Sequence, residues 1–401
     1  MSDRPIRILF VSSLPPVPTW GTSMTYFRHF CERPDFEVRV VTDHSDINRY
    51  DVPYRYRYVE RDATWRRLTR TRLSTWFHSW PLLVPSRRLT QIALDEGRTF
   101  KPDVVMTVGG SWFWTVPVAR AVARKLNVPL VGSFNDWWSY NVIYAKSLKP
   151  LLDRRFRAFY RDCDLALCTS EGMRAALGPH PNAALFYPTG APMPAVVPPP
   201  RAVSSPFRLV FGGNLGEWYG RMLEAIATAA DGDDGLRFDF YGGNPSWSEA
   251  FAARLRQLGA YHGQVPFETL REKMEEADAL LLFMGFDPAA RQVESTSFKT
   301  KFLDYLTFRR PILLWGPEYC SAVQVARRYD SAEICTSPDP SDFLKTIQRL
   351  RDDPDRRREL VENAQRMYHA DFHPDKIHQV LVDNIARLIG KPRSVTSTLK
   401  A

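Results

Sequence analysis

The sequence predicts an α/β protein with two domains, each built around a parallel β-sheet. Three observations favour this fold class: the length of 401 residues, short apolar runs that alternate with helical patterns, and a proline-rich segment near the middle. A chain of this length exceeds what one compact core usually serves. Alternation of strands and helices is typical of parallel sheets that helices cover on both faces.

The first half of the chain begins with a strand–helix–strand unit and repeats that order. The predicted strands are short apolar runs, and they are Ile6–Val11, Val38–Thr42, Val104–Val108, Leu130–Phe134 and Leu165–Thr169. Helical patterns at Thr22–Cys31 and Val116–Leu126 lie between them. We therefore expect residues 1–190 to form the first domain.

A proline-rich segment separates this array from a second one. Residues 191–206 have the composition of a semi-rigid linker. The strands predicted after it are Leu209–Phe211, Phe238–Tyr241, Ala279–Phe283 and Ile312–Trp315. We expect residues 207–373 to form the second domain, and residues 374–390 to form an amphipathic helix that crosses back to the first domain. Residues 391–401 are expected to be a tail.

Composition narrows the class of protein. The hydrophobic content of 44% and the charged content of 25% are typical of soluble globular proteins. No apolar run approaches the roughly 20 residues that span a bilayer, and the first residues lack a signal-peptide pattern, so we expect a cytoplasmic protein. The five cysteines lack the spacing of a zinc site and are expected to be reduced core thiols. The net charge of +9 favours anionic partners, but no nucleic-acid-binding module is present in the sequence.

Glycines occur in the loops after two predicted strands, at the edge where parallel sheets bind ligands. Gly21 follows the first strand and would let backbone approach a ligand, although an ordinary helix N-terminus explains it equally well. Gly213 and Asn214 follow the first strand of the second half. Arg221 would add a cation where a diphosphate lies against the next helix. The alternative for this segment is a common glycine-rich turn.

The strongest motif spans residues 294–306. Lys299, Thr300 and Lys301 combine cationic side chains with the amides of a predicted helix N-terminus, a combination that suits a leaving diphosphate. Asp304 lies one turn further along, where a carboxylate can accept both hydroxyls of a ribose. The alternative is a capped, solvated helix with ordinary surface lysines.

The segment KTKFLDYLTFRRPILLWG, residues 299–316, resembles part of the retaining GT-B glycosyltransferases of the group 1, family 4-like type. Further similar segments follow in the family's order, and they are PDVVMTVGG, FNDWW, DLALCTSEGM and YHGQVPFETL. The resemblance extends over nearly the whole chain. It implies two Rossmann-like parallel-sheet domains facing a cleft, with the donor bound mainly by the second domain and the acceptor mainly by the first.

The resemblance also implies roles for single residues of the second domain. Gly213 and Asn214 would lie at the diphosphate, Gln264 and Val265 would present backbone to the base, and Asp304 would hold the ribose. Relatives often have an arginine where this chain has Asn214, so phosphate binding is expected to depend more on the two lysines.

Two further positions depart from the pattern of the family. Many relatives carry two glutamates eight positions apart, whereas this chain has Thr296 and Asp304 there, with Glu294 nearby. Some relatives have His-Asp where this chain has Asn135 and Asp136. Asp136 is therefore the candidate on the acceptor side, with strand-end capping as its alternative role.

We thus expect a hexosyltransferase-type glycosyltransferase that uses a UDP-, GDP-, dTDP- or ADP-linked sugar and builds a glycan or glycoconjugate on a lipid-linked, glycan or small-molecule acceptor. The expected catalytic residues are Asp136, Glu294 and Lys301. Without an Asp-x-Asp cluster, neither a metal nor another cofactor is expected. A sugar-nucleotide epimerase of the same fold, or a non-catalytic nucleotide-sugar-binding or scaffolding protein, is the alternative. A nicotinamide-dependent oxidoreductase fits poorly because no G-x-G-x-x-G follows the first strand.

Residues 54–88 interleave arginines with aromatic residues. Such a stretch could contact anionic lipid on the inner face of a membrane or hold an acidic acceptor. Aromatic residues that pack on the sheet beneath a solvated basic face are the alternative interpretation.

Overall fold

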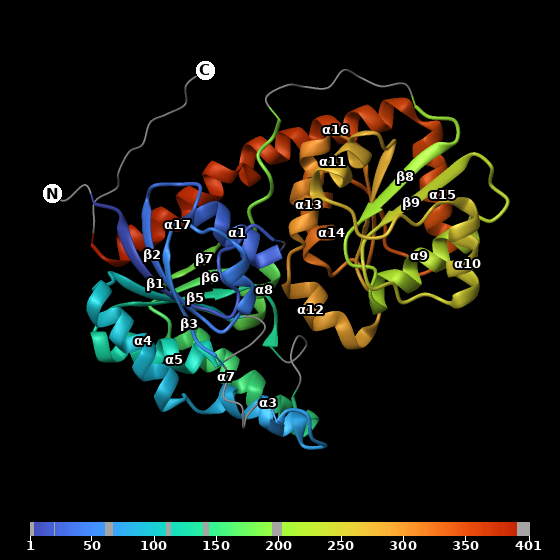
Figure 1. Ribbon diagram of the computed structural model, residues 1–401. Helices are drawn as coiled ribbons and strands as arrows, with labels where there is room; N and C mark the ends of the chain where they lie inside the picture. The colour runs from blue at the N-terminus through green and yellow to red at the C-terminus, as the bar shows by residue number, and fades with distance from the viewer. Residues whose placement is uncertain are drawn as a thin grey trace. The chain divides into compact units, whose positions relative to one another are not determined.

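The computed structural model describes residues 4–19, 21–60, 67–109, 114–138, 144–194 and 203–390. The chain forms two compact units, whose elements are labelled in Figure 1. Unit 1 consists of Met1–Thr189, Thr296–Phe298 and Asp375–Ala401, and unit 2 consists of Gly190–Ser295 and Lys299–Pro374.

Unit 1 contains a seven-stranded parallel sheet with the order β3-β2-β1-β4-β5-β6-β7. Its strands are β1 (Ile6–Val11), β2 (Phe36–Thr42), β3 (Arg55–Tyr58), β4 (Val104–Gly109), β5 (Leu130–Phe134), β6 (Leu165–Cys168) and β7 (Ala183–Leu185). Every residue of β4 and β5 is buried, which explains their mostly apolar sequence. The strand order reverses between β1 and β4, and ligands of such sheets bind at this switch point.

Helices cover both faces of the unit 1 sheet (Figure 1). The helices of this unit are α1 (Gly21–Phe30), η1 (Ser45–Arg49), α3 (Ser74–Leu83), α4 (Arg87–Phe100), α5 (Thr115–Leu126), η2 (Lys146–Leu148), α7 (Lys149–Asp162), α8 (Glu171–Leu177) and α17 (Pro374–Leu388). Leu9 of β1 packs with Phe156 of α7 in one apolar core. Its neighbour Phe10 packs with Tyr26 of α1 and Leu381 of α17 in the other, as the alternation of side chains along a strand requires.

The C-terminal helix α17 is also held on unit 1 by a chain of buried polar side chains. His378 Nδ1 lies 3.0 Å from His29 Nδ1, and His29 Nε2 lies 2.6 Å from Thr189 Oγ1. His378 Nε2 lies 3.0 Å from Asp35 Oδ2. Burial lowers the pKa of both histidines. With both rings neutral, one set of tautomers satisfies every atom: Thr189 donates to His29, His29 to His378, and His378 to Asp35.

Unit 2 contains a five-stranded parallel sheet with the order β12-β11-β10-β8-β9, and its switch point lies between β8 and β10. Its strands are β8 (Phe207–Gly212), β9 (Leu236–Tyr241), β10 (Ala279–Phe283), β11 (Ile312–Trp315) and β12 (Glu333–Cys335). Its helices are α9 (Glu217–Ala229), α10 (Glu249–Leu258), α11 (Phe267–Glu275), η3 (Pro288–Ala290), α12 (Arg291–Thr296), α13 (Thr300–Tyr305), η4 (Leu306–Phe308), α14 (Ser321–Tyr329), α15 (Pro340–Asp352), α16 (Pro354–Met367) and the π-helix η5 (Tyr368–Phe372).

The predicted fold class of two Rossmann-like parallel-sheet domains is confirmed by these two sheets. The predicted helix N-terminus within residues 294–306 is only partly right, because the helical structure breaks between α12 and α13. The five cysteines are free and four of them are buried. Within the described ranges, no helix is both long and apolar enough to cross a membrane, and no three His, Cys, Asp or Glu side chains are grouped to hold a metal ion.

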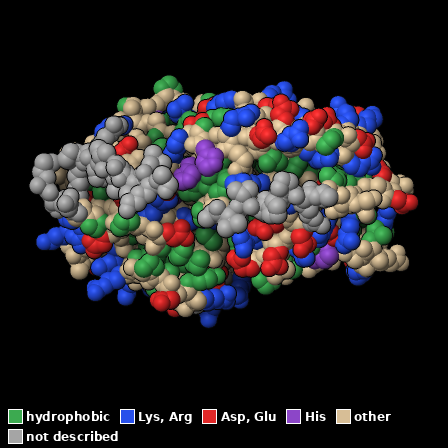
Figure 2. Space-filling view, turned by 90° about the horizontal axis from the view of Figure 1, so that it is seen from above, with side chains coloured by type: hydrophobic (Ala, Val, Ile, Leu, Met, Phe, Trp, Pro, Cys, Tyr) green, Lys and Arg blue, Asp and Glu red, His purple; other side chains and the backbone are tan. Residues whose placement is uncertain are grey.

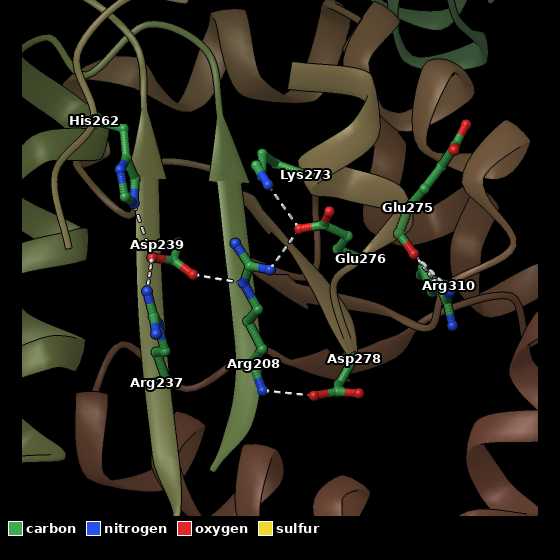
Figure 3. A network of polar contacts seen from close by, with 9 residues as sticks. All are labelled: Arg208, Arg237, Asp239, His262, Lys273, Glu275, Glu276, Asp278 and Arg310. Atoms are coloured by element: carbon green, nitrogen blue, oxygen red, sulfur yellow. Dashed lines mark hydrogen bonds and ion pairs between the residues drawn. The ribbon is translucent and has the colours of Figure 1, made fainter. Parts of the chain in front are cut away.

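A buried carboxylate joins the charged groups on β8 and β9 (Figure 3). Asp239 has no exposed side-chain surface, and it accepts hydrogen bonds from Arg208 Nε at 2.6 Å and from Arg237 Nη2 at 3.3 Å. His262 Nε2 lies 2.8 Å from Asp239 Oδ1, the oxygen that Arg237 also contacts. Arg208 also donates to Glu276 Oε2 at 2.9 Å. Burial raises the pKa of Asp239, but hydrogen bonds from His262 and Arg208 outweigh burial and lower the pKa below its ordinary value of 3.8.

The stability of the protein should therefore decrease at acidic pH through Asp239. Because the folded pKa lies below 3.8, the ionised carboxylate stabilises the fold above that pH, and the contribution is lost as the pH falls through the folded pKa. We expect Asp239→Asn to lower the free energy of unfolding at pH 7 by about 2 kcal/mol in urea denaturation. Asp231→Asn, which breaks the exposed ion pair with Arg254, should cost less than about 1 kcal/mol. Equal losses in the two variants would contradict this role for Asp239.

Candidate functional site

The loops that follow β8 and β9 contact each other through backbone atoms. Gly213 has a φ of 140° and its N–H donates to Tyr241 O at 2.9 Å. Gly242 has a φ of 150°, and a Cβ at this position would lie 1.7 Å from Gly213 O. Only glycine fits such an approach, so the two glycines let the loops after β8 and β9 come together beside the switch point of the sheet.

Lys301 reaches this loop from α13. A Cβ at Gly213 would lie 2.2 Å from Lys301 Nζ, which lies 4.0 Å from the centroid of the Phe211 ring and 5.7 Å from that of Tyr219. The pKa of Lys301 is lowered from 10.5 to about 7, mainly by burial and also by Lys299, while Asp304 opposes the shift. A bound anion would favour the charged form of this amine. A strongly perturbed pKa beside a strand-end loop is typical of a functional site.

Lys299 and Glu294 form an ion pair close to the ring of Tyr219. Lys299 Nζ lies 3.5 Å from Glu294 Oε2 and 5.9 Å from the ring centroid of Tyr219. Glu294 is fully buried, and its Oε1 accepts a hydrogen bond from Gly285 N at 3.2 Å, just beyond β10. Among the described residues, no hydrogen-bond donor reaches Oε2. A buried acceptor of this kind can bind a hydroxyl group of a ligand.

Three other predicted residues lie on the loop after β8, on α9 and on α13. Asp304 Oδ1 accepts a hydrogen bond from Ala191 N at 2.9 Å. Asn214 Oδ1 accepts one from Gly216 N at 3.0 Å, so this side chain braces its own loop. Arg221 is exposed on α9. Asp304 and Asn214 thus each have a backbone contact within unit 2.

The segment predicted to contact the base lies beside the loop after β9. Gly242 N donates to Gly263 O at 2.8 Å, directly before Gln264 and Val265. Gln264 Oε1 would lie 3.4 Å from a Cβ at Gly243. The predicted base and diphosphate segments therefore lie on neighbouring loops of unit 2.

Thr300 is the first residue of α13, a helix of six residues. So short a helix has a small macrodipole, and its cap residue Lys299 makes no side-chain capping bond. The structure thus places a helix N-terminus at Thr300, next to the two lysines, as the sequence predicted.

In unit 1, Asp136 and Gly21 lie beyond the carboxyl ends of β5 and β1. Gly21 opens α1 with a φ of 59°, and Asn135 Nδ2 donates to Thr22 Oγ1 at 3.2 Å. Asp136 Oδ1 accepts a hydrogen bond from Ser297 Oγ at 2.5 Å. These contacts join the end of β5 to α1 and to residues 296–298, which also belong to unit 1.

Solved structures of known proteins share this fold. A glycosyltransferase from Rickettsia africae has a TM-score of 0.68 and 11% identity, covering 97% of this chain and 100% of that one. Alr3699/HepE from Anabaena, in complex with UDP, has a TM-score of 0.66 and 12% identity, covering 95% and 100%. WaaG, described as a glycosyltransferase involved in lipopolysaccharide biosynthesis, has a TM-score of 0.59 and 14% identity, covering 94% and 99%. At these identities the likeness shows the fold. No curated protein sequence matches the chain.

Family models match both halves of the sequence. Residues 21–182 match the model of Glycosyltransferase Family 4, and residues 220–383 match that of Glycosyl transferase-like. The chain belongs to the GT-B glycosyltransferases. This confirms the family resemblance seen in the sequence and makes the candidate site of unit 2 part of a glycosyltransferase.

The glycosyltransferase site contains aromatic residues that sequence reasoning missed. The rings of Phe211 and Tyr219 face Lys301, and cations are attracted to such faces. Tyr305 OH lies 3.4 Å from both the N and the O of Gly212. Tyr219 is visible in the sequence directly after the glycine-rich loop, but the lysine lies on a helix far along the chain. No local pattern could therefore pair the two.

Proposed function

We propose that this glycosyltransferase transfers a hexose from a nucleotide-sugar donor, and that the diphosphate of the donor lies at the loop after β8. The observation that supports this most is the position of Lys301 Nζ, which lies against Gly213 with a pKa lowered to about 7. Donors at this position can compensate the charge of two phosphates. In support, the Anabaena relative with the same fold was solved in complex with UDP and with UDP-glucose.

The proposed chemistry follows from the charge that the reaction generates. Departure of the nucleoside diphosphate leaves negative charge on its phosphate oxygens, and Lys299 and Lys301 would stabilise that charge. Glu294 Oε2 would accept a hydroxyl of the donor sugar, and Asp304 would hold the ribose. We propose that the lysines take the role that a divalent cation has in other transferases, so that no metal is required.

On unit 1, Asp136 is proposed to orient the acceptor hydroxyl. We propose retention of the anomeric configuration, with a phosphate oxygen of the donor accepting the proton of the acceptor. The new glycosidic bond then forms on the face of the sugar from which the diphosphate leaves, and the phosphate carries the proton away.

A panel of nucleotides tests the proposal. A ligand that binds only the folded state raises the midpoint of thermal unfolding with its concentration, by about 2.7 kcal/mol of stability at 100 times its Kd. We expect one of UDP, GDP, dTDP and ADP to produce this shift, equally with magnesium and with EDTA. No shift with any of the four would contradict donor binding at this site.

Assays with the nucleotide sugar of the responding nucleotide then distinguish a transferase from an epimerase and from a binding protein. A transferase should release nucleoside diphosphate in proportion to the acceptor that is added. An epimerase should change the sugar of the intact donor without an acceptor. Binding without either conversion would identify a non-catalytic nucleotide-sugar-binding protein.

A further inference from the structure

Helix α3 of unit 1 carries a stripe of exposed apolar side chains. Leu73, Trp76, Trp80 and Val84 are 56%, 51%, 65% and 44% exposed. Their spacings of three, four and four residues place them along one side of the helix, with Leu73 as its cap residue and Val84 at its other end. Large apolar side chains in a row on a surface mark a binding face more often than single ones do.

The flank of α3 next to the stripe is anchored in unit 1. Ser79 is buried and its Oγ accepts a hydrogen bond from Ala145 N at 3.1 Å, while Leu83 packs against the apolar core. Figure 1 shows α3 next to α7 at the edge of the unit. The alternative interpretation of this segment required the aromatic residues to pack on the sheet, but Trp76 and Trp80 do not.

The sequence on both sides of the stripe carries positive charge and contains no acidic residue. Residues 67–94 contain no Asp or Glu. The arginines of this stretch are all exposed, and they are Arg67, Arg70, Arg72, Arg87 and Arg88. By contrast, α16 carries acidic residues on both sides of Arg358 in the sequence. Figure 2 shows blue and red side chains intermingled on the side where that helix lies.

We propose that α3 docks the protein on the surface of an anionic lipid bilayer. Indole rings are favoured at the boundary between headgroups and acyl chains, because they combine a large apolar body with one N–H donor. Arginines next to them are attracted by anionic headgroups, and either contribution alone gives weak binding. A stripe of apolar side chains between two groups of arginines fits such a surface. This inference goes beyond the proposed sugar transfer and does not depend on it.

Sedimentation with vesicles tests the docking directly. The intact protein is mixed with vesicles of phosphatidylcholine alone or with phosphatidylglycerol, at about 0.1 M and about 1 M salt, where the Debye length falls from roughly 10 Å to 3 Å. We expect binding to the anionic vesicles at low salt and a loss at high salt. Failure to bind anionic vesicles, or equal binding to both kinds, overturns the proposal.

Removal of the indoles should weaken vesicle binding without unfolding the protein. Trp76→Ser/Trp80→Ser should lower the partition coefficient by about tenfold or more, because the lost contact is apolar. Leu258→Ser/Phe267→Ser is the matched control, since these side chains are 63% and 56% exposed on unit 2. This control should bind within about twofold of the parent. Thermal unfolding verifies that all variants stay folded.

Removal of two positive charges next to the stripe should also weaken vesicle binding. Arg87→Gln/Arg88→Gln should lower the partition coefficient about 30-fold, from a contribution of about 1 kcal/mol for each cation near the surface. Lys345→Gln/Arg358→Gln removes the same charge from helices that also carry acids, and should have little effect.

Two patterns among these variants would overturn the proposal although the parent binds. An equal loss in both charge variants would show that the net charge of the whole chain is responsible. Dependence on the arginines without dependence on the tryptophans would identify a surface for soluble polyanions instead of a bilayer. Since no nucleotide is present in this assay, its outcome is separate from that of the donor-binding test.

Discussion

Lys301→Met should greatly weaken the binding of the responding nucleoside diphosphate and at the same time stabilise the folded protein. Hydrogen bonds to a charged group contribute about 1.5–3 kcal/mol each, so loss of the amine should weaken binding by roughly 10- to 150-fold in isothermal titration calorimetry. Methionine has a similar length and fills the space beside Phe211 without a charge. Replacing the cation should therefore raise the free energy of unfolding by about 1 kcal/mol or more at pH 6.

The pH dependence of this gain has a definite sign. The folded pKa of Lys301 is lowered from 10.5 to about 7, so between these values the unfolded chain binds a proton that the folded chain does not. The stability of the parent through this group therefore rises with pH across the window, and the charge costs most below pH 7. The advantage of Lys301→Met should be largest below pH 7 and disappear above about 10.5. Diphosphate binding at pH 8 should take up a proton, which is measured by titration in buffers of different ionisation enthalpy.

Lys299→Met is the matched control because the same chemical change has the opposite consequence there. Lys299 is the counter-ion of the fully buried Glu294. Without it the carboxylate is left unpaired, and we expect a loss of about 1–3 kcal/mol. A Lys301→Met variant that binds the nucleotide as the parent does, or that is destabilised like Lys299→Met, would contradict the assigned role of Lys301.

The fold could be predicted from sequence where strands are buried on both faces. Five of the inner strands, β1, β4, β5, β10 and β11, are short apolar runs that were predicted within about one residue of their observed bounds. The starts of β2 and β8 were predicted two residues late. Strand β3, with the sequence RYRY, was missed because it is an edge strand with mostly exposed side chains. The edge strands β7 and β12 have only three residues each, too few to show a period.

The residue types of the candidate site could be predicted from the sequence, but the contacts between these residues could not. Lysines beside Ser and Thr, and glycines after a strand, indicated anion binding near Gly213 and Lys301. That Lys301 Nζ lies against Gly213 depends on the neighbouring positions of β8 and β10 in the sheet, which no local spacing encodes. Lys299 and Glu294 are five residues apart in the sequence, a spacing that does not make neighbours on a helix. They form an ion pair because the helix breaks between α12 and α13.

Gly242→Ala should both destabilise unit 2 and abolish nucleotide binding. The φ of 150° is disfavoured for any residue with a Cβ, and the added atom would meet Gly213 O at 1.7 Å. Relief requires the loop after β8 to move, and that loop carries the backbone proposed to bind the diphosphate. Strain and overpacking together should cost about 4 kcal/mol in urea denaturation. The protein that remains folded should show no thermal shift with the responding nucleotide.

Gly232→Ala separates the two causes of this loss. Gly232 also has a positive φ, 87°, but among the described residues no atom lies within 4 Å of a Cβ placed there. This variant should lose about 1–2 kcal/mol from backbone strain alone and keep its nucleotide affinity. The difference between the two alanine variants then measures the collision with Gly213. If Gly242→Ala binds the nucleotide normally, the loop after β8 is not where the diphosphate binds, whatever the loss of stability.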